Sequence, residues 1–242
     1  MNAVVEPDSH PTNGGLAEGV TLSDKAISNM SSEEVKKWKS AITNELTAIA
    51  SAIRRVRKDE KVANIVRHKM ILQSKYYPDL RQTKEKARFV LAGCSQKEGR
   101  DYWITYSPVV KYNSFKVLLA IAAKEGWMLL QMDVPTAYLK AELDERVYMR
   151  IPSYWRQYMG DSYTPGEVVQ VTHAIYGLKQ SGRQWYLLLD TDLKDMGFQS
   201  LMCEPCLYAN ETKSVFVMIY VDDLFVTGRR EEDVRRMEDA LN

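Results

Sequence analysis

The chain has 242 residues, of which 45% are hydrophobic and 27% charged, and its formal net charge is +1. This composition provides a core for one large domain or two small ones, and no stretch approaches the ~20 apolar residues of a membrane-spanning helix. Three cysteines, an odd number, disfavour a disulfide scaffold. The opening residues lack the apolar core of a signal peptide, so we expect a cytoplasmic or nuclear protein rather than a secreted or membrane one.

The first fifty residues predict a linker followed by one helix. Residues 1–30 are polar and rich in Gly, Ser and Asn, so we expect them to be disordered or a linker. Ser31 and Glu34 have the spacing of a capping box. They open an amphipathic helix whose buried stripe is predicted to consist of Val35, Trp38, Ile42, Leu46 and Ile49.

Positive charge is concentrated in residues 54–100. This segment has fourteen Lys and Arg against five acids, so its net charge is +9 and that of the rest of the chain is −8. We expect short strands over 53–111 that would present a phosphate-binding face beside an acidic remainder. A solvated basic surface without a partner is the alternative interpretation of such a charge run.

Helices and strands alternate through the rest of the chain. We expect a helix from Asn113 or Ser114 through Ala123 that ends near Gly126, and an irregular stretch over 144–170, where Pro and Gly recur.

The last third of the chain predicts two further helices and short strands. One helix covers Gly182–Met196 and stops at Gly197, and a second begins at Glu231. Short strands are expected near 206–209 and 215–221. The buried stripe of the first of these helices is predicted to be Trp185, Leu188, Leu189 and Leu193.

Two adjacent acids, Asp222 and Asp223, interrupt an apolar run. Seven apolar residues precede them and three follow, a pattern that predicts strand, tight turn and strand. Like charges at the tip of a buried hairpin repel each other and lose hydration, whereas a hard cation such as Mg²⁺ is held by one or two carboxylates with substrate phosphates. Two water-facing turn residues are the alternative.

A third acid, Asp133, ends the apolar run that begins at Trp127, and a turn and short helix are expected after it. An Asp at a strand-to-helix junction commonly caps the helix. A strand ending in Asp133 and a hairpin carrying Asp222 and Asp223 in one chain instead predict a two-metal phosphoryl-transfer site.

These acids belong to a longer series of short motifs. The series is Lys86-Ala-Arg88, Tyr106-Ser-Pro-Val-Val-Lys111, Leu118-Leu-Ala-Ile-Ala-Ala123, Gln131-Met-Asp-Val134, Ala137-Tyr-Leu139, Val147-Tyr-Met149, Ile175-Tyr-Gly-Leu-Lys-Gln180, Trp185-Tyr186, Glu204-Pro-Cys-Leu-Tyr208 and Tyr220-Val-Asp-Asp223. In this order the motifs resemble the reverse transcriptase of copia-type long-terminal-repeat retrotransposons, a Pol polyprotein segment. The resemblance extends from about Trp38 to the end of the chain.

The resemblance implies an α+β fold, that of a right-hand polymerase. One domain over 31–242 would comprise fingers at about 53–111 and a palm at about 112–242, with a ferredoxin-like palm sheet and a truncated thumb. The implied activity is that of an RNA-directed DNA polymerase, which extends a primer with dNTPs on an RNA or DNA template. The implied setting is the cytoplasm, within a virus-like particle, or the nucleus; no oligomeric state is implied.

The resemblance also implies the metal site. Asp133 and Asp222 would hold two Mg²⁺ ions, for which Mn²⁺ could substitute, and Asp223 would support them as a weaker ligand. One ion would activate the primer 3′-hydroxyl and the other would hold the triphosphate. Because neighbouring residues of a strand point to opposite faces, Asp222 ranks above Asp223 as a direct ligand.

Other residues receive roles from their positions in the motifs. Lys86 and Arg88 would bind the incoming triphosphate, and Tyr138 would lie under the sugar and exclude a 2′-hydroxyl, unless it is a core aromatic. Gly177 would let the backbone approach the template–nucleotide pair, and Lys179 and Gln180 would contact the backbone or the nascent pair. Nucleic-acid contacts are expected from Lys69, Lys84, Lys179 and Arg183.

Two other interpretations stay open. The chain departs from the family pattern at Lys69-Met-Ile-Leu72, Ala92-Gly93, Ala137-Tyr-Leu-Lys-Ala141 and Ser181-Gly-Arg183, which would suit an inactive retroelement remnant that folds or binds nucleic acid without turnover. A different metal-dependent enzyme of the palm type, such as a nucleotidyl cyclase, would not need the basic segment.

Overall fold

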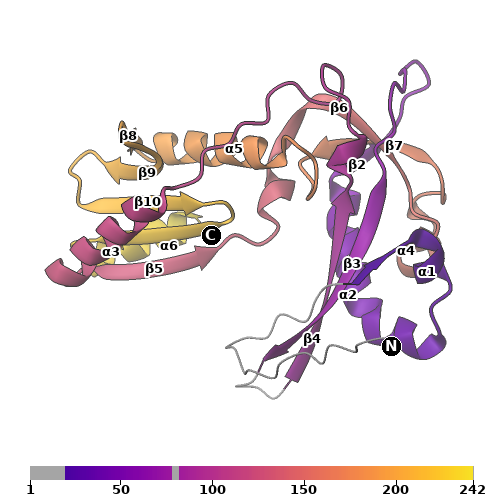
Figure 1. Ribbon diagram of the computed structural model, residues 1–242, viewed down its shortest axis with the longest axis horizontal. Coiled ribbons are helices and arrows are strands. Elements are labelled where there is room, and N and C mark those ends of the chain that lie inside the picture. Colours follow the sequence, from indigo (N-terminus) through magenta and orange to yellow (C-terminus); the bar gives the residue numbers. More distant parts are fainter. Residues whose placement is uncertain (1–19, 78–81, 242) are drawn as a thin grey trace, which may run out of the picture.

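The computed structural model describes residues 20–77 and 82–241, which form two lobes side by side (Figure 1). We call residues 20–101 and 141–178 the ribbon lobe and residues 110–140 and 181–241 the aspartate lobe. Each lobe is built around its own cluster of buried apolar side chains. None of the described helices is long and apolar enough to cross a membrane.

The ribbon lobe contains two three-stranded antiparallel sheets. The first has the order β1-β3-β4 and the second the order β2-β7-β6. Two long strands of the first sheet form a ribbon that extends away from the body of the lobe (Figure 1). The strands are β1 (Val20–Leu22), β2 (Ile53–Arg55), β3 (His68–Tyr77), β4 (Gln82–Leu91), β6 (Glu142–Arg150) and β7 (Val168–His173).

Helices pack around the ribbon lobe's core. The longest, α2 (Ser32–Ser51), begins with the predicted capping box, since the Ser31 hydroxyl accepts from the backbone N–H of Glu34 and the Glu34 carboxylate accepts from that of Ser31. Its predicted stripe is confirmed at Ile42, Leu46 and Ile49, which are buried. The other helices are α1 (Asp24–Ser28), η2 (Gly93–Ser95), α4 (Trp155–Met159) and η4 (Gly160–Ser162).

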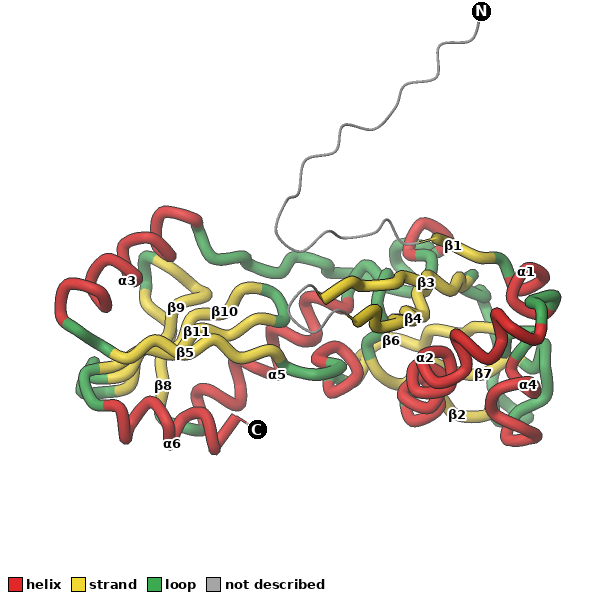
Figure 2. Tube along the Cα trace, turned by 90° about the horizontal axis from the view of Figure 1, so that it is seen from below, coloured by secondary structure: helices red, strands yellow, loops and turns green. Residues whose placement is uncertain are grey.

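The aspartate lobe is a five-stranded antiparallel sheet with the order β5-β11-β10-β9-β8. Figure 2 shows α3 on one side of this sheet and α6 on the opposite side. The strands are β5 (Met128–Asp133), β8 (Phe198–Leu201), β9 (Glu204–Asn210), β10 (Val215–Tyr220) and β11 (Asp223–Gly228). The helices are α3 (Tyr112–Glu125), η3 (Ala137–Lys140), α5 (Ser181–Asp195) and α6 (Glu231–Leu241).

Part of the expected linker is folded. Residues 1–19 lie outside the described residues, but β1 pairs with β3 and α1 buries Ile27 completely. The Asp24 carboxylate lies 3.0 Å from His68 Nε2 and accepts from the Ser153 backbone N–H. These contacts are non-local, so a polar composition did not reveal them.

The expected boundary between 53–111 and 112–242 does not separate the two lobes. β2 pairs with β7, with Ile53 opposite Val171, so residues 141–178 join the first lobe and the chain then returns to the second. The stretch 144–170, expected to be irregular, contains most of β6, all of α4 and the start of β7. Its Pro and Gly residues fall mainly in the connections between these elements.

Two helix ends test the local predictions. α3 ends at Gly126 as predicted, with Gly126 at φ +65°, a left-handed conformation that glycine adopts without strain. Its N-cap is Lys111, which makes no side-chain capping bond, rather than Asn113 or Ser114. The predicted final helix is confirmed as α6 from Glu231.

Candidate active site

The predicted hairpin is formed by β10 and β11. Tyr220 pairs with Asp223, which leaves Val221 and Asp222 as a two-residue turn, with Val221 at φ +59°. The indole N–H of Trp185 donates to the Val221 carbonyl at 2.8 Å, and the Val134 N–H donates to the Asp222 carbonyl at 3.4 Å. A β-branched residue with positive φ is strained, and these two bonds hold the turn in place.

Strand pairing brings two of the predicted acids together. In the β5–β11 register Asp133 lies directly opposite Asp223, and residues opposite each other in an antiparallel pair point to the same side. Like charges in this arrangement destabilise a sheet. The Gln131 amide donates to the Asp223 carboxylate at 3.3 Å. The register therefore pairs Asp133 with Asp223, and the ranking of Asp222 above Asp223 stays a prediction.

These carboxylates suit a hard divalent cation in their chemistry. Oxygen donors are the ligands that Mg²⁺ and Mn²⁺ prefer, and an opposed Asp133–Asp223 pair is relieved by a cation between the two charges. Within residues 20–77 and 82–241, no group of three or more His, Cys, Asp and Glu side chains is gathered closely enough to hold a metal ion. The residues therefore fit a cation as a pair, with Asp222 beside them at the turn.

The Asp222 side chain faces a tyrosine from another part of the chain. The Tyr176 hydroxyl donates to Asp222 Oδ2 at 3.4 Å, and the Tyr176 ring lies 4.7 Å from that of Tyr138 in η3. The Arg88 guanidinium of β4 lies 4.9 Å from the centre of the Tyr176 ring. Arg88, Tyr138 and Asp222, which the sequence predicted separately, thus meet around Tyr176.

Burial and charge act on both tyrosines. Burial, followed by the nearby Asp222 carboxylate, raises the pKa of Tyr176 to about 12, although Arg88 acts in the opposite direction. The pKa of Tyr138 is raised by the same two causes, and Arg88 again opposes them. Both phenols therefore stay protonated near neutral pH and act as donors or as neutral rings.

The predicted phosphate-binding cations share one face of the β3–β4 ribbon. Along β4, Ala87, Phe89 and Leu91 are buried, so the residues that alternate with them point to the other face. Lys69 on β3 is opposite Val90, which places it on the same face. The exposed or half-buried cations of this face are Lys69, Lys84, Lys86 and Arg88.

Gly177 is required by a contact inside the protein. Its φ is +90°, and a Cβ added there would lie 2.1 Å from the Leu91 carbonyl oxygen. The Gly93 N–H donates to the Gly177 carbonyl at 3.0 Å, and the Leu91 N–H donates to the Tyr176 carbonyl at 2.8 Å. The glycine thus lets the 174–180 loop lie against the end of β4, and its approach to a nucleotide stays a prediction.

Gln180 requires a correction. Its side chain is fully buried, its Oε1 accepts from Gln96 at 2.9 Å and its amide donates to the Asp101 carbonyl at 2.7 Å. A side chain enclosed in this way does not reach a nascent base pair. Gln180 instead joins the start of α5 to the 93–101 loop, and burial of this kind depends on packing that the motif does not encode.

Comparison with known proteins adds to this geometry. A family model described as reverse transcriptase (RNA-dependent DNA polymerase) matches residues 54–242. The chain belongs to the reverse transcriptase family. The match covers both the basic ribbon and the three aspartates, and it confirms the resemblance inferred from the motifs.

The relatives of this chain include retrotransposon polyproteins. Two are retrovirus-related Pol polyproteins from transposons RE2 and RE1 of Arabidopsis thaliana, 34% and 36% identical over 74% and 68% of this chain and 12% and 11% of the relatives. A third, from transposon TNT 1-94 of Nicotiana tabacum, is 31% identical over 72% of this chain and 13% of its own length. The chain therefore spans only about an eighth of these curated relatives.

The remaining predicted cations of the chain are Lys179 and Arg183. Lys179 is exposed, with its ammonium 5.3 Å from the centre of the Tyr102 ring. The Arg183 guanidinium donates to the Tyr106 carbonyl at 3.3 Å. Each side chain contacts a residue of the 102–109 connection, and their contacts with nucleic acid stay predictions.

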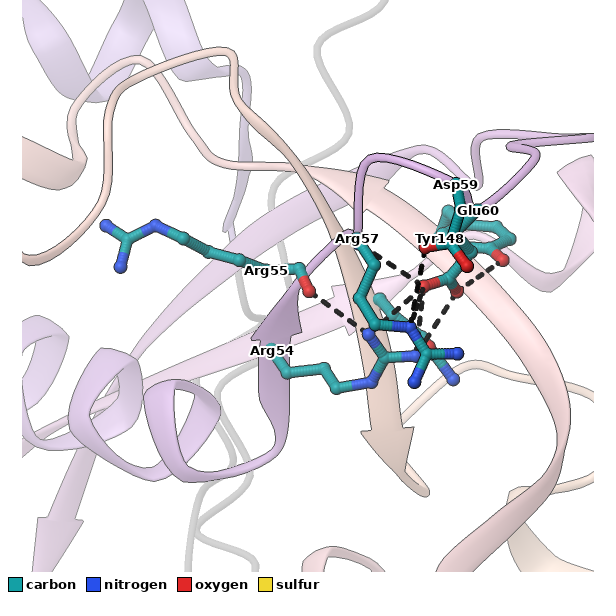
Figure 3. A network of polar contacts seen from close by, with 7 residues as sticks. Arg54, Arg55, Arg57, Asp59, Glu60 and Tyr148 are labelled. Atoms are coloured by element: carbon teal, nitrogen blue, oxygen red, sulfur yellow. Dashed lines mark hydrogen bonds and ion pairs between the residues drawn. The ribbon is translucent and has the colours of Figure 1, made fainter.

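Part of the basic segment is neutralised internally (Figure 3). The Arg54 guanidinium lies 3.1 Å from the Glu60 carboxylate, which also accepts from the Tyr148 hydroxyl at 2.8 Å and from the Arg57 N–H at 3.4 Å. Burial would raise the pKa of Glu60, but these donors outweigh it and lower the pKa to about 2. The nine-charge excess is therefore not one continuous binding face.

Three residues of the site were not assigned a role from the sequence. Tyr176 lies inside the Tyr-Gly-Leu-Lys-Gln motif and Gln131 lies two residues before Asp133, while Trp185 was predicted only as part of a buried stripe. A polar group next to a motif aspartate was the available signal for Gln131. The contacts of Tyr176 and Trp185 join distant segments, which no local pattern encodes.

Proposed function

We propose that this chain carries the catalytic centre of an RNA-directed DNA polymerase that extends a primer 3′-hydroxyl with dNTPs on an RNA or DNA template. One observation carries the proposal: the cation of Arg88 and the carboxylate of Asp222 both contact a single side chain, Tyr176, the first at its ring and the second at its hydroxyl. A triphosphate with its divalent cation needs both charges within a short distance of each other.

In this proposal the ribbon lobe is the fingers and the aspartate lobe is the palm. The order β5-β11-β10, with α5 and α6 in the same lobe, supports a ferredoxin-like palm. Residues 141–178 would belong to the fingers, because β6 and β7 pair there with β2.

Each residue would have a distinct task. Arg88 and Lys86 would bind the phosphates from the ribbon side, Arg88 through its planar pair of N–H donors. Tyr138 would lie under the sugar, held by its contact with Tyr176. Asp133 and Asp223, with Asp222 at the turn, would hold the divalent cations, which when bound supply activation of the 3′-hydroxyl and stabilise the leaving group.

Primer extension tests the proposal. Poly(rA)–oligo(dT) with dTTP and Mg²⁺ or Mn²⁺ is supplied to the wild type, to Asp222→Asn and to Asp192→Asn, a matched change of an exposed acid on α5. We expect extension by the wild type and by Asp192→Asn and its loss in Asp222→Asn. Equal extension by Asp222→Asn would refute the site.

If the wild type shows no primer extension, one further experiment is needed. The same assay on a longer polyprotein segment that contains this chain separates weak binding of the primer–template from an inactive remnant. Extension by the longer protein, lost with Asp222→Asn, would support the proposal. No extension by the longer folded protein would overturn it in favour of a remnant without turnover.

A further inference from the structure

Tyr176 contacts two groups of opposite charge, the guanidinium of Arg88 and the carboxylate of Asp222. Arg88 lies over its ring, at 4.9 Å from the ring centre, and Asp222 accepts from its hydroxyl at 3.4 Å. Across the described part of the chain, Arg88 forms no ion pair within 4.0 Å with any acid, Asp222 included. One tyrosine side chain therefore contacts a cation of the ribbon lobe and a carboxylate of the aspartate lobe.

The backbone of Tyr176 is fixed to the strand that carries Arg88. The Leu91 N–H donates to the Tyr176 carbonyl at 2.8 Å, and the Gly93 N–H donates to the Gly177 carbonyl at 3.0 Å. Because Gly177 has no Cβ, the loop can lie against the Leu91 carbonyl. Arg88 and Tyr176 thus belong to one unit, while Asp222 belongs to the hairpin of the aspartate lobe.

The second contact of the ring fixes its orientation. The Tyr138 ring packs against Tyr176 at 4.7 Å between ring centres and an interplanar angle of 58°. The Tyr176 ring thus contacts Arg88 and Tyr138, and its hydroxyl donates to Asp222. A half-buried ring with three such contacts has little freedom to swing away and let Arg88 reach Asp222.

We propose that Tyr176 is a positioning residue that prevents Arg88 and Asp222 from neutralising each other, so that Arg88 stays available for a triphosphate and Asp222 for a divalent cation. The inference rests on the proposed function, because it takes the triphosphate to bind at Arg88 and the cation at Asp222. An Arg88–Asp222 ion pair would compete with both ligands, since each charge would already have a partner.

The proposal predicts a reciprocal rescue. In Tyr176→Ala, Arg88 reaches Asp222, and Mn²⁺ affinity, measured from the electron paramagnetic resonance signal of free Mn²⁺, falls about fivefold, as a partly screened ion pair allows. Arg88→Gln in the Tyr176→Ala background removes the competitor and restores Mn²⁺ binding. Tyr176→Phe keeps the ring and loses only the hydroxyl, so it weakens binding less than Tyr176→Ala does.

A complementary experiment measures triphosphate binding in the absence of metal. Binding of inorganic triphosphate in EDTA falls about fivefold in Tyr176→Ala and is restored by Asp222→Asn in that background. Glu45→Gln is the matched control, because Glu45 on α2 is a second carboxylate whose charge interacts with Arg88. Restoration by Glu45→Gln instead of Asp222→Asn would overturn the proposal.

The outcomes separate the inference from the function on which it rests. If Asp222→Asn leaves Mn²⁺ binding of the wild type unchanged and Arg88→Gln leaves triphosphate binding unchanged, both are overturned. If those single changes weaken binding but Tyr176→Ala binds like the wild type, or is not rescued, only the positioning role of Tyr176 is overturned. Tyr176→Leu, which keeps apolar bulk, replaces Tyr176→Ala if circular dichroism shows that the alanine variant does not fold.

Discussion

Glu60 in the ribbon lobe and the three aspartates of the aspartate lobe differ in how many hydrogen bonds their carboxylates accept. Both oxygens of Glu60 accept from donors of the protein, three times from Arg54, once from the Tyr148 hydroxyl and once from the Arg57 backbone N–H. Asp222 and Asp223 each accept one long side-chain bond, at 3.4 and 3.3 Å. The Asp133 carboxylate accepts none from the described residues.

The difference separates structural acids from acids available to a ligand. A carboxylate whose lone pairs are filled by fixed donors has nothing left for a cation. Carboxylates that face each other with few donors keep acceptor capacity for a ligand, at a cost to stability. The cations divide in the same way. Arg54 and Arg55 form ion pairs with Glu60 and Glu167, respectively. Arg88 lies over an aromatic ring and has no acid of the described residues within ion-pair distance.

Removing an available acid gives the largest expected effect. Asp133→Asn should reduce metal-dependent primer extension on the order of a thousandfold, since a metal ligand stabilises the transition state by several kcal/mol. Its melting temperature should be equal to or above that of the wild type, because the change removes one of two opposed like charges. Near-normal extension, or a large loss of stability, would place Asp133 among the structural acids.

The next largest effect should be on sugar selectivity, and it should distinguish Tyr138, the tyrosine near the aspartates, from Tyr148, the tyrosine near Glu60. Tyr138→Ala should admit ribonucleotides, with discrimination against them falling on the order of a hundredfold, because a steric barrier to the 2′-hydroxyl is lost. Tyr148→Phe, which removes the donor to Glu60, should leave sugar selectivity unchanged. Competing incorporation of dTTP and UTP measures both, and unchanged selectivity in Tyr138→Ala would refute a sugar-excluding role.

The two kinds of cation can be compared in the same assay. Arg88→Gln should raise the KM for dNTP about tenfold, the size of one lost charge-assisted hydrogen-bond pair. Arg55→Gln, which loses an internal pair with Glu167 at 3.1 Å, should leave the KM unchanged. Equal KM values for the two variants would show that the triphosphate binds elsewhere.

The smallest expected effect concerns Glu60 and appears in stability. Glu60→Gln should lower the free energy of unfolding by about 1–2 kcal/mol at pH 7, a value kept low because Arg54 is partly exposed and its charge is screened.

The pH dependence of Glu60 follows from its pKa, which falls from an ordinary 4.5 to about 2 on folding. A lowered pKa means that the stabilisation is complete above about pH 4.5 and is lost as the pH falls toward 2. Urea unfolding at pH 7 and pH 3 measures it. A difference between wild type and Glu60→Gln that does not shrink at the lower pH would contradict this account.

The aspartates could be recognised from the sequence because their signal is local. An apolar run broken by two acids predicts a hairpin, and β10, the turn and β11 confirm it. Which acid stands opposite Asp133 could not be predicted, because the register is set by pairing between strands some ninety residues apart. Gln180 shows the same limit, since its motif suggested a ligand contact and its packing buries it.

By itself the sequence determined the elements whose rules span a few residues. Capping at Ser31, the stop at Gly126, the α5 stripe and the hairpin follow from hydrogen-bonding and periodicity within one element. Only the tertiary structure decided that residues 141–178 return to the first lobe and that Tyr176 contacts both Arg88 and Asp222. Such contacts form when distant segments bury apolar surface together, and that free energy belongs to the whole packing arrangement rather than to any one segment.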